Sequence, residues 1–154
     1  MSSVLVVKRP VVTYAAAAAP TVFTDISQYI KKITIKPKRG KVDVRGYGDT
    51  GPHNEKTDPE HQVDLDFFHS RAWSAFSDLM ATELNADDNT IFRVRYRGTT
   101  AVGVDNPTFQ FAVKFLDMGT IGGEKNTASM MTMSLDIEGM VQKSVDGTTF
   151  TDYI

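Results

Sequence analysis

Apolar and polar residues alternate along most of this sequence, and this period of two constrains the fold more than any other feature. Successive side chains of a β-strand point to opposite faces, so the alternation predicts half-buried antiparallel strands with one polar face each. The predicted strands are 33–35, 41–45, 63–67, 92–97, 109–115 and 131–138. With 154 residues, of which 41% are hydrophobic, the chain can close one core. We therefore predict a single, mainly β domain, an antiparallel β-sandwich or barrel.

One segment, 70–84, has a helical period instead. Its large apolar residues recur at steps of three and four, which predicts one amphipathic helix flanking the sheet, with Ser70 as its N-cap. These residues are Trp73, Phe76, Met80 and Leu84.

Two polar stretches, 47–60 and 99–107, are predicted as loops because they lack an apolar face. Compact domains of this size rarely contain a loop of about 12–15 residues without a function, so we expect the longer loop to make an interaction.

The first 20 residues do not fit the strand pattern. They contain an alanine run and, after Pro10, no Leu, Ile or Phe, so they only weakly imitate a signal peptide. We expect 1–20 to be an uncleaved N-terminal arm that does not pack on itself, followed by the domain 21–154. No run approaches the ~20 apolar residues that span a bilayer, and we expect no membrane association.

Candidate cofactor and metal motifs are weak. The segment GYGDTG has the spelling of a dinucleotide-binding motif, but Pro52 and a polar stretch follow it where a helix is required. The three histidines, His53, His61 and His69, lie near several acids but lack the spacing of metal ligands. The chain has no cysteine, which excludes thiolate chemistry and the common structural zinc sites. We expect no cofactor and no metal.

Paired acids lie two residues apart on two predicted strands, Asp64 with Asp66 and Asp136 with Glu138, so that each pair shares a face. Nothing in the sequence places a nucleophile or an acid–base partner beside them, and an exposed sheet face shifts pKa values little. We therefore expect no catalytic residue and no enzyme. The acids indicate a wet polar face or a deliberately anionic surface.

Basic residues also share a face on the strand 92–97, where Arg93, Arg95 and Arg97 alternate with Phe92 and Tyr96. The aromatic residues point away from the arginines and so are expected to fill the core rather than stack on bases. The formal net charge of -2 and the pI near 5.9 also disfavour a nucleic-acid binder. A small β-barrel module that binds nucleic acid or a ligand through this arginine face is the alternative function.

The order of these segments resembles the major tail tube proteins of long-tailed, siphovirus-like bacteriophages. The resemblance covers about 25–146 and rests on order and spacing. The segments are DISQYIKKITI, KVDVRGYGD, a long polar loop, HQVDLDFF running into the helix around Trp73, FRVRYRG, NPTFQFAVKFLDM and SMMTMSLDIEGMV.

The resemblance implies a β-sandwich subunit with a flanking helix, six copies of which close a ring, while the rings stack into a tube. It also implies an arm and a long loop that reach neighbouring rings, and an acidic lumen through which double-stranded DNA passes without specific binding. The implied partners are the chain itself, a tape-measure protein, and the tail terminator and tail-tip proteins. The implied location is the virion, after assembly in the bacterial cytoplasm.

Candidate residues follow from this interpretation. The lumen-facing candidates are Asp64, Asp66, Asp136 and Glu138. The inter-subunit or inter-ring candidates are Val4, Val6, Val11, Tyr14, Tyr47, His53, Glu55, Lys56 and Asp58. Like charge on the lumen wall would keep DNA from adsorbing, because adsorption is driven by counterion release at cationic sites.

Overall fold

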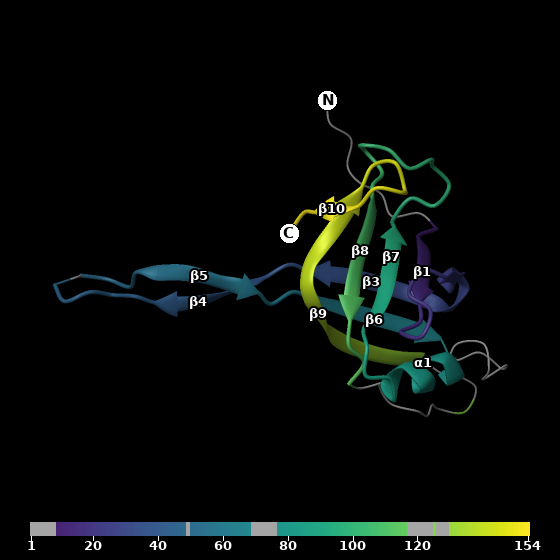
Figure 1. Cartoon of the computed structure of the whole chain (residues 1–154), viewed down its shortest axis with the longest axis horizontal. Helices are drawn as coiled ribbons and strands as arrows, with labels where there is room; N and C mark the ends of the chain where they lie inside the picture. The colour runs from purple at the N-terminus through teal and green to yellow at the C-terminus, as the bar shows by residue number, and fades with distance from the viewer. Residues whose placement is uncertain (1–8, 49, 69–76, 117–124, 126–129) are drawn as a thin grey trace.

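The structure is a computed structural model that describes residues 9–48, 50–68, 77–116, 125 and 130–154 (Figure 1). Its strands are β1 (Val11–Ala15), β2 (Phe23–Asp25), β3 (Ile30–Lys36), β4 (Arg39–Asp43), β5 (Asn54–Pro59), β6 (Gln62–Phe68), β7 (Thr90–Arg95), β8 (Thr108–Val113), β9 (Met130–Ser144) and β10 (Thr151–Asp152). A 3-10 turn, η1 (Ser27–Tyr29), precedes β3, and the α-helix α1 (Ser77–Leu84) precedes β7.

The main sheet is antiparallel and has the strand order β2-β1-β7-β8-β9-β6-β3, with β10 also paired to β9. The long strand β9 curves along the body, pairing with β6 in its first half and with β8 in its second (Figure 1). Gly139, which has a φ of 78°, lies where β9 passes from one partner to the other. The positive φ is available to glycine at little cost, so this position lets the strand change direction.

Because β9 bends, the two halves of the sheet face one another and enclose the core between them. Ile33 and Leu65 from one half lie across from Phe92 and Phe111 of the other around a small central void. The alternate residues of β6, Val63, Leu65 and Phe67, are all buried, as the period of two predicts. The expected mainly β, antiparallel sandwich with one short helix is confirmed.

The N-terminal segment differs from the expected arm. Residues 11–15 form β1, which lies between β2 and β7 in the sheet, and Val12 and Tyr14 are buried in the core. The sequence could not show this, because VVTYA is short and its neighbours are alanines with no pattern of their own. The boundary expected at residue 20 therefore does not separate an arm from the body, since β1 is part of the body.

The segment expected as a long loop also differs. Residues 54–59 form β5, which pairs with β4 in a separate two-stranded sheet. Figure 1 shows this hairpin projecting from the body. Both strands are almost entirely exposed, including Val42, which the alternation had assigned to a buried face. A strand without a buried face needs no alternation of apolar residues, so the polar sequence of β5 predicts a loop.

The helix is confirmed over its last eight residues, and its Met80 is buried. The expected N-cap Ser70 and the apolar residues Trp73 and Phe76 lie outside the described residues. The second expected loop, 99–107, is organised by Asn106, whose buried amide donates hydrogen bonds to the carbonyl oxygens of Arg97, Thr100 and Ala101.

Candidate functional site

The two pairs of acids lie on one surface. In the register of β6 and β9, Gln62 is opposite Asp136 and Asp64 is opposite Ser134. Asp64, Asp66 and Asp136 therefore form one acidic face on the outer side of the sheet, away from the core, and Glu138, which is opposite Ala112 of β8 and lies near Gln62 and Asp136, extends this face along β9. The sequence left open which pair belonged to the anionic surface, and the strand pairing places both there.

Two lysines from the edge strand β3 border this acidic face. Lys32 is opposite Asp66, and Lys36 forms an ion pair with Asp64. Four carboxylates against two ammonium groups leave the acidic face with a formal negative charge.

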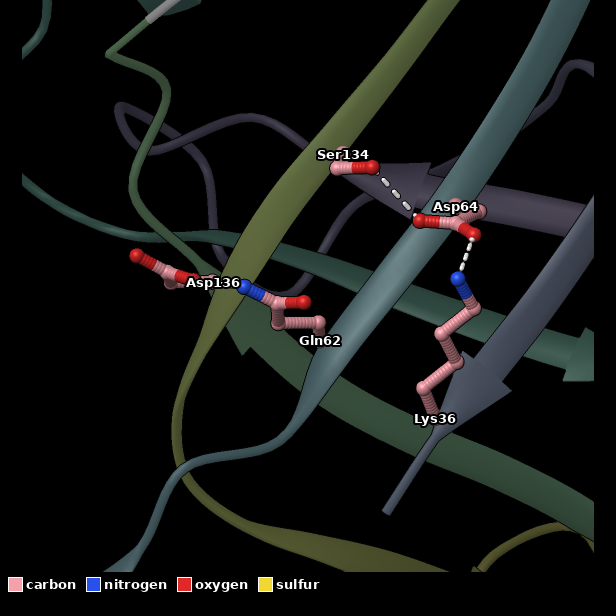
Figure 2. Close-up of polar contacts among 5 residues, drawn as sticks. All are labelled: Lys36, Gln62, Asp64, Ser134 and Asp136. Atoms are coloured by element: carbon pink, nitrogen blue, oxygen red, sulfur yellow. Dashed lines mark hydrogen bonds and ion pairs between the residues drawn. The ribbon is translucent and has the colours of Figure 1, made fainter. Parts of the chain in front are cut away.

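Asp64 is the most constrained of these acids. Figure 2 shows its carboxylate between Lys36 and Ser134, whose hydroxyl donates a hydrogen bond of 2.6 Å to Oδ1. The neighbouring Gln62 donates from Nε2 to Asp136 at 3.1 Å. Two hydrogen bonds hold the pKa of Asp64 below its ordinary value. The one from Lys36 makes the larger contribution and the one from Ser134 the next. Asp64 thus stays ionised at neutral pH as part of a cross-strand polar network.

The arginine face has a different environment from the one expected of a binding surface. The Arg93 guanidinium lies between two phenyl rings, 3.8 Å from the centroid of Phe23 and 4.5 Å from that of Phe150. Its Nε donates to Gln110 Oε1 at 2.8 Å, and burial lowers the pKa of the guanidinium. Arg93 therefore clamps β2 and the C-terminal turn onto the sheet, and its Nε donor is committed to Gln110.

The hydrogen bonds from Arg93 continue across the outer face of β8 and β9. Gln110 Nε2 donates to Gln142 Oε1 at 2.9 Å, and Gln142 Nε2 donates to Asp152 Oδ1 at 3.3 Å. The sequence analysis missed this row, although Gln110 stands at a polar position of the alternating strand.

The other two arginines of this face are also partly buried. Arg95 donates to the carbonyl oxygen of Gly98 at 3.3 Å, and its buried Nε has no partner among the described residues. Arg97 is half-buried. The three arginines thus do not present a row of free guanidinium groups.

The projecting hairpin carries most of the expected contact residues. Tyr47, at its tip, is 110% exposed, and His53, Glu55, Lys56 and Asp58 are exposed as well. Across the two strands of the hairpin, Lys41 lies directly opposite Lys56. Like charges in this position repel one another, and neither lysine has an acidic partner among the described residues.

The contact residues expected in the arm are only partly available. Tyr14 is buried in the core, where burial and then the nearby Glu83 raise its pKa, so it is not a contact residue. Val11 is half-buried in β1. Val4 and Val6 lie outside the described residues.

Among the described residues, no three His, Cys, Asp or Glu side chains are grouped as they would be around a metal ion. His53 is on the exposed hairpin, His61 is buried with its Nδ1 accepting from the Lys38 amide at 2.8 Å, and His69 lies outside the described residues. None of the described helices has the length and apolar character needed to span a membrane.

The fold recurs in a solved assembly. The structure superposes on a chain of the cryo-EM structure of the anti-feeding prophage baseplate, determined with 6-fold symmetry, with a TM-score of 0.60. The match covers 94% of this chain and 97% of the other. The two proteins share one fold. Their sequences are only 14% identical, and no protein-family model or curated protein matches this sequence.

Proposed function

We propose that this chain is a non-enzymatic structural subunit of a phage tail tube that assembles from identical copies into stacked, hexameric rings. The tube would surround the tape-measure protein, end at tail terminator and tail-tip proteins, and conduct DNA into the bacterial host. The observation that carries this proposal is the superposition over nearly the whole of both chains on a component of a 6-fold phage-derived particle.

The edge of the main sheet supports the proposal. Strand β3 pairs only with β6 among the described strands, so one side of a seven-residue strand is left for another partner. Its edge lysines, Lys31, Lys32 and Lys36, disfavour indiscriminate pairing. A head-to-tail contact through such an edge closes a ring when the rotation between copies permits it.

The hairpin β4–β5 supports stacking. The strands pack mainly on each other rather than on the body, and Val42 and Val44 are exposed by 47% and 41%. An isolated two-stranded hairpin is at best marginally stable in water. Docking on a neighbouring copy would stabilise it and would connect one ring to the next.

The acidic face is the proposed lumen wall. Its four carboxylates come from two adjacent strands, and its lysines are placed beside them, with Lys36 bound to Asp64. The formal negative charge of this wall would repel DNA, and Lys36 is already paired with Asp64, so the DNA would pass without adsorbing.

Negative-stain microscopy and sedimentation of the purified chain test the proposal. We expect concentration-dependent rings or tubes. The double substitution V42D/V44D on the hairpin should leave the fold intact, because both side chains are exposed, but should prevent stacking. Val104→Asp is the matched control, since Val104 is 77% exposed in another loop. Monodisperse monomers of the unaltered chain at high concentration, even with a tail initiator present, would contradict the proposal.

The alternative, a nucleic-acid-binding module, is less well supported because Arg93 is stacked between phenyl rings and Arg95 bonds to the backbone. If it were correct, replacing Arg93, Arg95 and Arg97 would abolish salt-sensitive DNA retention without changing the oligomeric state.

A further inference from the structure

The two chain segments that lead into and out of the hairpin β4–β5 meet the body at His61. The backbone N–H of Ile137 in β9 donates to the carbonyl oxygen of His61 at 2.8 Å, which fixes His61 to the main sheet. The ring nitrogen Nδ1 of His61 accepts from the backbone N–H of Lys38 at 2.8 Å. The carbonyl oxygen of Lys38 in turn accepts from the N–H of Glu60 at 2.8 Å. The ring of His61 therefore attaches the base of the hairpin to the body.

Beyond this attachment the hairpin has little support from the body. Strands β4 and β5 pair with each other, both are almost entirely exposed, and Figure 1 shows them projecting from the body. Arg39 makes a weaker approach to the body, with its Nη2 3.7 Å from Sδ of Met140. Because the hairpin extends far from its base, the contact at His61 controls the direction in which it points.

The hydrogen bond from Lys38 also defines which nitrogen of His61 carries the proton. A neutral imidazole has one donor and one acceptor nitrogen. Nδ1 is the acceptor, so Nε2 carries the proton, and Nε2 is buried with no partner among the described residues. A second proton can be added only at Nδ1, where the N–H of Lys38 already points. Two donors would then face each other and the hydrogen bond would be lost, in a side chain that is only 3% exposed.

Charged groups of both signs surround His61. On the side of the acidic face, three carboxylates lie around it, those of Glu60, Asp136 and Glu138. On the side of the hairpin, four cations lie around it, those of Lys38, Arg39, Lys41 and Lys56. Among the described residues, none of these acids forms an ion pair with His61. The two sets oppose each other in their effect on an added proton, so the hydrogen bond from Lys38 decides the outcome.

We propose that His61 is a pH-sensitive anchor of the hairpin: its neutral ring holds the hairpin in one direction, and uptake of a proton at Nδ1 releases it. Histidine is the side chain that ordinarily changes charge between about pH 5 and 8, so the release belongs to mildly acidic solution. The Asp64 carboxylate stays ionised there, because its pKa lies below the ordinary 3.8. Since the hairpin is the proposed contact between rings, its release would weaken stacking, and this consequence alone rests on the proposed function.

Distance measurements on the unassembled chain test the anchor directly. The chain has no cysteine, so spin labels can be attached at E55C on strand β5 and at D88C in the turn after α1, where both side chains are exposed. We expect a narrow distribution of distances at about pH 7.5 and a broad one at about pH 5.5. The change should reverse when the pH is restored, in dilute protein that forms no rings.

Substitutions of His61 in the labelled chain separate protonation from packing. His61→Asn keeps an acceptor oxygen near the position of Nδ1 but takes up no proton, so the distribution should stay narrow at both pH values. His61→Phe keeps an aromatic ring without an acceptor and should give a broad distribution at both. The matched control is His53→Asn, because His53 is an exposed histidine of the same hairpin, and it should respond to pH like the unaltered chain. Circular dichroism checks that each variant is folded.

Nitrogen-15 NMR of the imidazole rings provides an independent readout. At neutral pH, His61 is expected to show a protonated Nε2 and an unprotonated Nδ1. The opposite tautomer would overturn the proposal, because Nδ1 could not then accept from Lys38.

The outcomes separate this inference from the proposed function. In assembly experiments, the concentration needed for tubes should rise about tenfold in mild acid, as expected for loss of a buried hydrogen bond, and should not rise in His61→Asn. A distribution that stays narrow in mild acid, or a response to pH that persists in His61→Asn, overturns the anchor and leaves the tube proposal intact. If the distribution broadens as expected but the unaltered chain forms neither rings nor tubes, the anchor is supported and the tube proposal fails.

Discussion

At the scale of single residues, the surroundings of a side chain decide its role more than its chemical type does. Arg93 and Arg95 stand at equivalent positions of one strand, yet Arg93 is stacked between Phe23 and Phe150 while Arg95 bonds to a turn carbonyl. Arg93 therefore holds together three segments that are distant in the sequence, which are β2, β7 and the C-terminal turn.

Arg93→Lys is expected to destabilise the subunit by about 1 kcal/mol, although the charge is kept. The lysine loses the planar stacking on the two rings and the directed hydrogen bond to Gln110. Chemical denaturation measures this difference. Arg97→Lys, whose side chain makes no described contact, should change stability by less than about 0.5 kcal/mol; an equal loss in both variants would show that the stacking contributes nothing.

Asp64→Asn should lower the stability of the subunit at pH 7 by less than about 1 kcal/mol, because the ion pair with Lys36 is on the surface. The pKa of Asp64 is lowered in the folded state from an ordinary value of 3.8, so its stabilisation is fully present above that pH. It is lost as the pH falls below 3.8 through the folded-state pKa. The difference between Asp64→Asn and the unaltered chain should therefore disappear in acid.

Urea denaturation at pH 7 and in steps below pH 3.8 checks this dependence. Asp66→Asn is the control, because Asp66 has no ion pair among the described residues. A difference for Asp64→Asn that persists unchanged in acid would exclude the ion pair as its cause.

At the scale of elements, one alternating pattern has two structural outcomes. Strand β7 and strand β4 both alternate, but Val94 in β7 is fully buried whereas Val42 in β4 is 47% exposed. Strand β7 lies between two neighbours in the main sheet, and β4 has only β5. The period of two thus indicates a strand, while burial depends on which surface faces it.

The same substitution in these two strands should therefore have different effects. Val94→Ala removes two buried methyl groups and is expected to destabilise the subunit by about 2 kcal/mol. Val42→Ala should change the stability of the unassembled subunit by less than about 0.5 kcal/mol and should weaken assembly instead. Thermal unfolding and sedimentation of both variants test this, and a large loss of monomer stability in Val42→Ala would argue against a solvent-exposed hairpin.

At the scale of the whole molecule, charge is segregated between surfaces although the net charge is only -2. The acids of β6 and β9 share one face, and the arginines of β7 lie in the other half of the sheet. The acidic face keeps a formal negative charge although Lys32 and Lys36 border it, which is the sign that the proposed lumen wall needs to repel DNA.

Reversing charges on the acidic face with D66K/D136K should leave the tubes intact but make them retain DNA at low salt. The retention should fall steeply as salt is added, because it depends on counterion release. Filter binding of assembled tubes measures it. D87K/D88K, in the exposed turn after α1, makes the same change in net charge, and equal retention by both variants would place the lumen elsewhere.

The amino-acid sequence by itself determined the main-sheet strands β3, β6, β7, β8 and β9, the single helix and the pairing of acids on shared faces. These features depend on the local spacing of apolar and polar residues, which can be seen in a short run of consecutive residues. The strand β5 and the inserted strand β1 were not predictable, because β5 has no buried face and the partners of β1 are distant in the sequence.

Only the tertiary structure decided that Asp64 and Asp136 share one surface, that Tyr14 is buried, and that Arg93 is enclosed by two phenyl rings. Each of these features depends on strand register or on contacts between chain segments that are more than 50 residues apart in the sequence. A local pattern of alternation does not specify such contacts. Periodicity specifies which side of a strand a residue occupies. Which neighbour meets that side is set by the bend of β9 and by the packing of the two halves on one core.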